Sequence, residues 1–109
     1  MTLQAAVTVS DDATVIHLVG ELDMSTVGTL REAVQAHLPG PSGRLVVDLA
    51  ELAFCDSLGL GTLLVLSRTA RAHSTLLVLG RPSSYFLRMV EIAGVGAGLT
   101  IAPDEAPDQ

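Results

Sequence analysis

A serine lies where an apolar run passes into a helix-like pattern, in the segment Phe54-Cys55-Asp56-Ser57-Leu58-Gly59-Leu60-Gly61. The segment follows the apolar-rich residues 45–49 and opens a stretch of regularly spaced apolar residues that continues to about Arg71. This order predicts a strand, a tight turn and the start of a helix, with the Ser57 hydroxyl at the helix N-terminus. Unpaired backbone N–H groups and the positive end of the helix dipole favour an added anion there. The chemistry that the arrangement predicts is phosphorylation of Ser57.

The same turn has a purely structural interpretation. Asp and Ser are common N-cap residues, because their side-chain oxygens accept hydrogen bonds from N–H groups of the first helical turn. Asp56 and Ser57 can therefore act as caps without any further role. The choice between the two interpretations depends on the rest of the chain.

The surrounding residues do not match the motifs of an enzyme. A hydrolase nucleophile elbow has glycine two residues before and two residues after the serine, whereas Ser57 has Cys55 before it and Gly59 after it. The Gly59-Leu60-Gly61 stretch lacks the Gly-Lys-Ser/Thr ending of a P-loop. The three histidines, isolated in sequence and without ligand spacing, are predicted to lie on strand or helix surfaces rather than at a metal: His17, His37 and His73. We expect no catalytic residue, no cofactor and no metal.

Composition predicts a single folded domain that does not bind nucleic acid. The chain has 109 residues, of which 49% are hydrophobic and 17% charged, and with one Tyr and two Phe its core must be aliphatic. The net charge is −6 and the six basic residues, all Arg, are scattered, so no basic surface is expected for a phosphate backbone.

Cysteine usage and the chain start predict a cytoplasmic protein. Cys55 is the single cysteine, which excludes an internal disulfide and fits a reducing compartment, and we expect it to be buried beneath the turn. The first nine residues alternate between polar and apolar and do not resemble a signal peptide. No apolar stretch is long enough to span a bilayer, so we expect no membrane partner.

The hydrophobic periodicity predicts an α/β fold in the order ββαβαβαβ, with a mixed, mostly parallel sheet and helices packed against it. Residues 1–102 would form the domain, and residues 103–109 a disordered acidic tail. The expected elements are an antiparallel strand pair at 3–9 and 15–19, a helix capped by Ser25 that continues to Pro39, a buried strand at 45–49, a helix from the Ser57 turn to Arg71, a strand at 76–79, a helix from Ser83 or Ser84 to Gly94, and an edge strand at 99–101.

This order and three segments resemble the STAS domain family, specifically its stand-alone bacterial anti-sigma factor antagonists. The segments are Gly20-Glu21-Leu22-Asp23, the turn Asp56-Ser57-Leu58-Gly59-Leu60, and Leu79-Gly80-Arg81-Pro82 through Ala93-Gly94. The resemblance implies a STAS fold and a protein that binds a kinase-like anti-sigma factor and thereby releases a sigma factor. In the family, the anti-sigma factor can use ATP to phosphorylate a Ser or Thr of the turn, and a phosphatase restores the antagonist. On this basis the chain is a phosphoryl acceptor, not an enzyme.

The resemblance also implies which residues meet the partner. Glu21 and Asp23 would lie on the same rim as the turn, where they can contact Arg or Lys, although a solvated strand end and a helix cap explain them equally well. Met24 and Leu58, at the starts of two helices, are either exposed anchors or core residues. The expected partner-binding set is Glu21, Asp23, Met24, Asp56, Leu58 and Gly59.

One departure from the family leaves a second function open. Many members carry two hydroxyl residues after the Asp, whereas Ser57 is followed by Leu58. The alternative is a non-phosphorylated STAS interaction or scaffold module, or an accessory subunit of a transporter. In either case we expect a monomer or a weak homodimer.

Overall fold

The computed structural model describes residues 2–40 and 42–103. Their order is the predicted ββαβαβαβ, with a short 3₁₀ turn at Gly96–Gly98 before the last strand. The predicted tail, residues 103–109, lies outside the described residues except for Pro103. The elements are β1 Leu3–Val9, β2 Thr14–Leu22, α1 Val27–Gln35, β3 Arg44–Cys55, α2 Ser57–Ala72, β4 Leu76–Gly80, α3 Ser84–Ala93 and β5 Thr100–Ala102.

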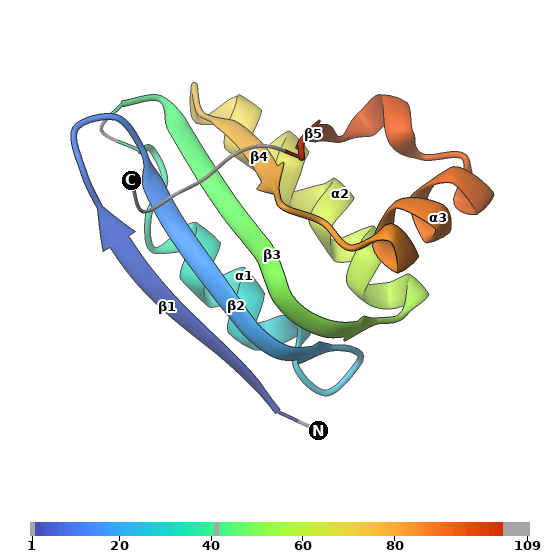
Figure 1. The fold of residues 1–109 in the computed structure, drawn as a ribbon. Helices are drawn as coiled ribbons and strands as arrows, with labels where there is room; N and C mark the ends of the chain where they lie inside the picture. Colours follow the sequence, from blue (N-terminus) through green and yellow to red (C-terminus); the bar gives the residue numbers. More distant parts are fainter. Residues whose placement is uncertain (1, 41, 104–109) are drawn as a thin grey trace.

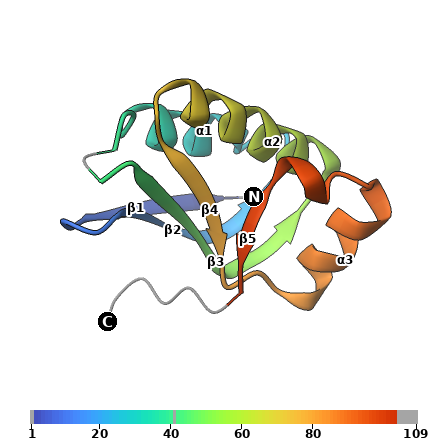
Figure 2. The ribbon, with the colours of Figure 1, turned by 90° about the horizontal axis from the view of Figure 1, so that it is seen from above.

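The five strands form one sheet in the order β1-β2-β3-β4-β5 (Figure 1). β1 is antiparallel to β2, and the remaining neighbours are parallel. Each parallel pair is connected by a helix, as parallel strands require. α1 and α2 lie side by side over one face of the sheet, and α3 lies beyond α2 at one end of the molecule (Figure 2).

The main core lies between the sheet and the helices and is aliphatic, as the composition predicted, with Phe86 as the aromatic exception among the described residues. Strand residues alternate between the two faces, so β3 sends Leu45, Val47 and Leu49 into this core. The largest fully buried side chains are Ile16, Leu18, Leu22, Leu30, Leu45, Leu49, Leu63, Leu66, Leu77, Leu79, Val34 and Val46.

β2 and β3 are longer than the periodicity predicted. β3 continues to Cys55, and β2 continues to Leu22, where Leu22 pairs with Cys55. β4 pairs with only the first part of β3, from Arg44 to Asp48. The last residues of β2 and β3 therefore extend past β4 as a projection, along which β1 pairs with β2 as far as Gly20. Many of the β3 residues in it are exposed, which weakened the strand pattern in the sequence. This projection carries both candidate turns to the same edge of the sheet.

The start and end of α1 differ from the prediction. Ser25 does not cap the helix, because its hydroxyl donates to the Asp23 carboxylate at 2.7 Å. The helix begins at Val27 after Thr26, which makes no side-chain capping bond, and it ends at Gln35 before the predicted stop at Pro39.

Candidate functional site

The turn between β3 and α2 assigns different roles to its two polar residues. Asp56 is the N-cap of α2, and its carboxylate accepts the Gly59 N–H at 2.7 Å. The Asp56 N–H donates to the Leu22 carbonyl at 3.1 Å, which ties the turn to the end of β2. Ser57 is the first residue of the helix and is exposed. The capping interpretation is therefore correct for Asp56, whereas the Ser57 hydroxyl makes no hydrogen bond to any residue the structure describes.

The N–H groups of the first turn of α2 are only partly satisfied. Gly59 and Leu60 donate to the side chain and the carbonyl of Asp56. Within the described residues, the N–H groups of Ser57 and Leu58 have no such partner. Two donors thus remain beside the exposed hydroxyl, at the positive end of a 16-residue helix.

Gly59 is buried and fixes the position of the turn. A Cβ at this position would lie 2.8 Å from Leu22 Cγ, 2.9 Å from the Leu22 carbonyl oxygen and 3.0 Å from Cys55 Sγ. Only a residue without a side chain lets α2 begin this close to the strand ends. Gly59 is thus needed for the position of the turn, and its contact with a partner stays a prediction.

Cys55 is buried beneath the turn, as the sequence predicted. Burial, with a further contribution from the Asp56 charge, raises the pKa of its thiol to about 12. The protonated thiol donates to the Asp56 carbonyl at 3.4 Å. Because the thiolate is the reactive form, this cysteine has a structural role only.

The turn after β2 lies next to the Ser57 turn, because the two strand ends are paired. The Asp23 carboxylate accepts the Ser25 N–H at 2.9 Å and the Ser25 hydroxyl at 2.7 Å, and these bonds lower its pKa. Thr26 Oγ1 accepts the Asp23 N–H at 2.9 Å and donates to the Glu21 carbonyl at 2.8 Å. Asp23 is buried and its carboxylate is bound within the turn, whereas Glu21 is half-buried and takes part in these bonds through its backbone carbonyl.

Three large apolar side chains are exposed at these strand ends. Met24 is 76% exposed, Leu58 48% and Phe54 37%. The core interpretation is therefore wrong for Met24 and Leu58, and Phe54 was not singled out from sequence. Exposed apolar side chains beside a spare hydroxyl are suited to contact with another protein.

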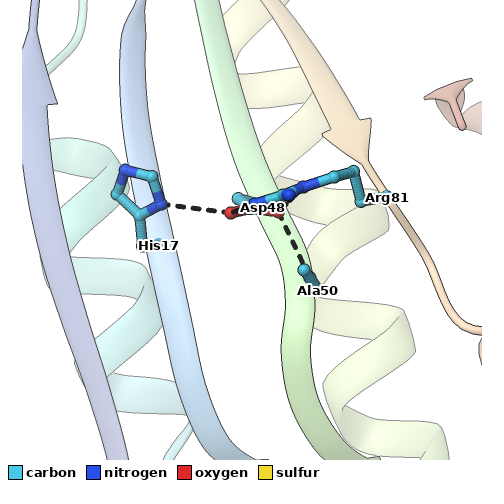
Figure 3. A network of polar contacts seen from close by, with 4 residues as sticks. All are labelled: His17, Asp48, Ala50 and Arg81. Atoms are coloured by element: carbon cyan, nitrogen blue, oxygen red, sulfur yellow. Dashed lines mark hydrogen bonds and ion pairs between the residues drawn. The ribbon is translucent and has the colours of Figure 1, made fainter. Parts of the chain in front are cut away.

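The buried carboxylate of Asp48, outside the two turns, was not predicted from the sequence. Asp48 lies within the apolar run of β3, on the face of the sheet opposite α1 and α2, and its side chain is 6% exposed (Figure 3). Arg81 donates two hydrogen bonds to it, from Nε to Oδ1 at 3.1 Å and from Nη2 to Oδ2 at 2.8 Å. His17 Nδ1 lies 3.1 Å from Oδ2, and the Ala50 N–H donates to Oδ1 at 3.2 Å. A single Asp inside an apolar strand was the signal that could have revealed the network.

Burial and hydrogen bonding have opposite effects on the pKa of Asp48 in this network. Burial disfavours the charged carboxylate, but the hydrogen bonds from Arg81, the Ala50 N–H and His17 outweigh it and hold the Asp48 pKa below its ordinary value. Arg81 has a left-handed backbone with φ of 50°, an uncommon conformation for a residue with a side chain. The ion pair thus joins β2 and β3 to the start of the β4–α3 connection.

Two further properties limit the chemistry of the described part of the chain. Among residues 2–40 and 42–103, no three His, Cys, Asp or Glu side chains form a group that could hold a metal ion. Over the same residues, no helix has both the length and the apolar character needed to cross a membrane.

Comparison with known proteins assigns this α/β fold to a defined class. Residues 5–101 match the family model described as "Mlab, STAS domain". The chain belongs to the STAS domain family, as the sequence motifs predicted.

Named relatives and solved structures agree with this assignment. The chain is 31% identical over 80 residues to the anti-sigma-B factor antagonist of Listeria monocytogenes, covering 73% of this chain and 70% of that one. It is 30% identical over 98 residues to the anti-sigma F factor antagonist of Lysinibacillus sphaericus, covering 89% and 84%.

The anti-sigma factor antagonist SpoIIAA is structurally similar in two states. Its unphosphorylated form superposes with a TM-score of 0.70 at 27% identity, covering 93% of this chain and 88% of that one. The phosphorylated form, described as a Bacillus cell fate determinant, gives 0.66 at 26% identity, covering 93% and 91%.

Proposed function

We propose that this protein is an anti-sigma factor antagonist: it binds an anti-sigma factor that has serine-kinase activity, and so releases a sigma factor in the cytoplasm. The observation that carries the proposal is the exposed Ser57 hydroxyl at the first position of α2, with Leu58 and Met24 exposed nearby. The proposal is supported by relatives of about 30% identity that are named anti-sigma factor antagonists. A phosphatase would return the protein to its binding form.

In the proposed switch, the Ser57 oxygen attacks the γ-phosphorus of ATP bound to the anti-sigma factor. The hydroxyl loses its proton, the bond to the β,γ-bridging oxygen breaks, and ADP leaves. The phosphoserine carries about −1.5 to −2 charges near neutral pH and stands next to Asp56. When the partner docks, this charge must be desolvated against neighbouring negative groups.

The expected effect on binding is large and local. At an effective dielectric constant of about 20, two unit charges about 6 Å apart interact by roughly 3 kcal/mol, which changes an affinity about a hundredfold. In the free protein, the unpaired N–H groups of Ser57 and Leu58 can bind the phosphate oxygens. Phosphorylation should therefore weaken docking without unfolding the domain.

The direct experiment is incubation of the protein with the candidate kinase and ATP, followed by mass measurement and mapping of the modified residue. We expect one phosphate on Ser57 and no incorporation in Ser57→Ala. A phosphate at another residue would contradict the assignment of Ser57.

Charge at Ser57 should decide affinity. We expect Ser57→Asp to bind the anti-sigma factor at least about tenfold more weakly, because it adds a negative charge beside Asp56, whereas Ser57→Ala binds as the wild type does. Titration calorimetry measures both affinities. Ser84→Asp is the matched control and should leave affinity unchanged. Like Ser57, Ser84 is exposed and is the first residue of its helix, after the N-cap Ser83. Equal affinities of Ser57→Asp and Ser57→Ala would remove the charge argument.

A second candidate function is a STAS module that docks without phosphorylation, as a scaffold or a transporter subunit. It is favoured by Leu58, which leaves one hydroxyl in the turn, and by the description of the matching family model as "Mlab, STAS domain". In that case the kinase assay yields no phosphoprotein, and affinity capture with the full chain recovers a membrane permease with its ATPase rather than an anti-sigma factor.

A further inference from the structure

β1 forms one edge of the sheet and lacks the features that normally keep an edge strand from pairing with a further strand. Among the strands that the structure describes, its one neighbour is β2, and Figure 1 shows it at the outer side of the sheet. Natural edge strands are usually short, bulged, or interrupted by charged residues or proline. β5, at the other edge, has three residues, whereas the seven residues of β1, LQAAVTV, include no charge and no proline. The pairing of β1 with β2 has no register shift, unlike that of β2 with β3.

The hydrogen bonds just beyond the two ends of β1 show which of its backbone groups point away from β2. The Ser10 N–H donates to the Ala13 carbonyl at 3.0 Å, and both residues continue the register of the strand pair. The Glu21 N–H donates to the Thr2 carbonyl at 2.9 Å in the same register. Because bonded and non-bonded residues alternate in an antiparallel pair, the even-numbered residues of β1 bond to β2. The outward N–H and C=O groups therefore belong to Leu3, Ala5, Val7 and Val9.

The outward-bonding residues also carry apolar side chains, all on the face of the sheet that α1 and α2 cover. Leu3 and Ala5 belong to the main core or pack against it. Val7 is 37% exposed and Val9 59%. An edge with open backbone groups and apolar side chains at alternate positions binds an extended strand, which adds to the sheet through main-chain hydrogen bonds. The occupant that fits this edge is therefore a β-strand.

A second β1, antiparallel and related by a two-fold axis through Ala6, satisfies all of these groups at once. Positions at equal distances before and after Ala6 then face each other, so Ala5 lies opposite Val7 of the second copy. In the same way, Leu3 lies opposite Val9 of the second copy. Each of these facing pairs shares two hydrogen bonds, and the exposed valines pack against core-facing residues of the other copy. The same surface thus meets itself, as a two-fold interface requires.

The lack of charge on β1 favours this pairing. The chain carries a net charge of −6, so two copies repel each other over most of their surface. On the face of β1 that points away from the helices, the register sets Gln4 opposite Thr8 and Ala6 opposite Ala6 of the second copy. No like charges are therefore brought together along the strand.

We propose that β1 pairs with β1 of a second copy in this antiparallel register, so that the two sheets join into one, with the helices of both copies on the same face. The contact is confined to two seven-residue strands about 23 Å long, and it is small beside the roughly 800 Å² per partner of a stable interface. The dimer is therefore weak and depends on concentration. Because β5 is a short edge, association stops at two copies. The proposal does not rely on Ser57 or on an anti-sigma factor.

The first measurement is sedimentation equilibrium of the full chain from about 10 µM to about 1 mM, a range suited to weak association. We expect the mean mass to rise above that of the 11.3 kDa monomer as the concentration increases, and to stay at or below that of a dimer.

Substitutions of Ala6, which is exposed and lies on the proposed axis, test both the partner and the register. Ala6→Lys and Ala6→Glu should each weaken association at least about tenfold, because two like charges then stand directly opposite each other. An equimolar mixture of the two variants should associate at least as tightly as the wild type, since the facing charges are opposite. Leu76→Lys is the matched control: it adds a charge at a 43% exposed position of β4, away from β1, and should leave association unchanged. Circular dichroism verifies that each variant is folded.

Amide hydrogen exchange locates the contact on the strand. The N–H groups of Ala5 and Val7 should exchange more slowly at the top of the concentration range than at the bottom, because they become hydrogen-bonded between copies. The N–H groups of Ser57 and Leu58, at the start of α2, are the control and should exchange at the same rate throughout. A monomer at every concentration, a mixture that associates as weakly as either Ala6 variant alone, or exchange at Ala5 and Val7 that does not depend on concentration would each overturn the proposal.

Discussion

At the scale of single residues, the structure separates two roles, helix capping and exposure of a free hydroxyl. From sequence, both Asp56 and Ser57 were candidate caps, whereas in the structure Asp56 is the cap and Ser57 is exposed. Because the Asp56 carboxylate caps α2 and its N–H binds the end of β2, the turn is complete without the serine hydroxyl. Ser57 is then exposed at the end of a helix with two unpaired donors. A residue that contributes little to its own fold is free to be modified without loss of stability.

Asp48 is the opposite case, a polar residue whose role is stability. We expect Asp48→Asn to lower the free energy of unfolding by about 1–3 kcal/mol, because it removes charge-assisted bonds from Arg81 and His17 in a buried place. Urea unfolding at about pH 7, where the carboxylate is ionised, measures the difference from the wild type.

The pH dependence of that difference follows from the lowered pKa. The carboxylate binds protons more weakly in the folded state than in the unfolded state, where its pKa is near 3.8. Its contribution is therefore fully present above that value and is lost as pH falls through the folded pKa. The stabilities of the wild type and Asp48→Asn should therefore approach each other as the pH falls below about 4 and become equal only below the folded pKa. A gap that stays constant down to the acid transition would show that the charge is not involved.

At the scale of elements, the projection formed by the ends of β2 and β3 positions the start of α2. Leu22 pairs with Cys55, the Asp56 N–H binds the Leu22 carbonyl, and Gly59 packs against both of these strand residues. The helix start is thus held by backbone bonds and close packing rather than by long side chains.

This packing predicts opposite effects for two nearby glycines. Gly59→Ala should destabilise the protein by about 1–3 kcal/mol, because its Cβ would overlap Leu22, including backbone. Gly61→Ala should stabilise it by up to about 1 kcal/mol, since space is open there and alanine favours a helix interior. Thermal or urea unfolding of both variants checks the pair. Equal and small effects would mean that α2 can move away from the strand ends at no cost.

At the scale of the whole molecule, the proposed docking surface combines two turns that are far apart in the chain. Met24 follows β2 and Leu58 follows β3, and the parallel pairing of these strands brings both turns to one edge of the sheet. The far end of the sheet, where Val9 pairs with Thr14, is a separate surface.

We expect Met24→Ser and Leu58→Ser each to weaken binding of the proposed anti-sigma factor by about tenfold, because exposed apolar anchors lose their contact with it. Stability should change by no more than about 0.5 kcal/mol, since both side chains already face solvent. Val9→Ser, which alters a residue 59% exposed at the far end of the sheet, should leave affinity unchanged. Comparable losses in all three variants would show that docking does not use this edge.

Local patterns were sufficient for the element order, the family, the buried Cys55 and the serine at a helix start. These features depend on the spacing of apolar residues and on turn residues, which neighbours along the chain already define. The lengths of β2 and β3 were underestimated, because β3 beyond Asp48 has no β4 partner and many of its last residues are exposed, so the apolar pattern of the two strands weakens there.

Which side chains of the turns reach solvent was decided by the packing of the strand ends. Gly59 packs against Leu22 and Cys55 while Leu58 beside it is exposed, and the Ser25 hydroxyl binds the Asp23 carboxylate. Asp48 and Arg81 are likewise 33 positions apart and meet only because β3 and β4 are neighbours. Contacts between distant segments depend on strand order and register, and the spacing of residues along one segment carries no information about them.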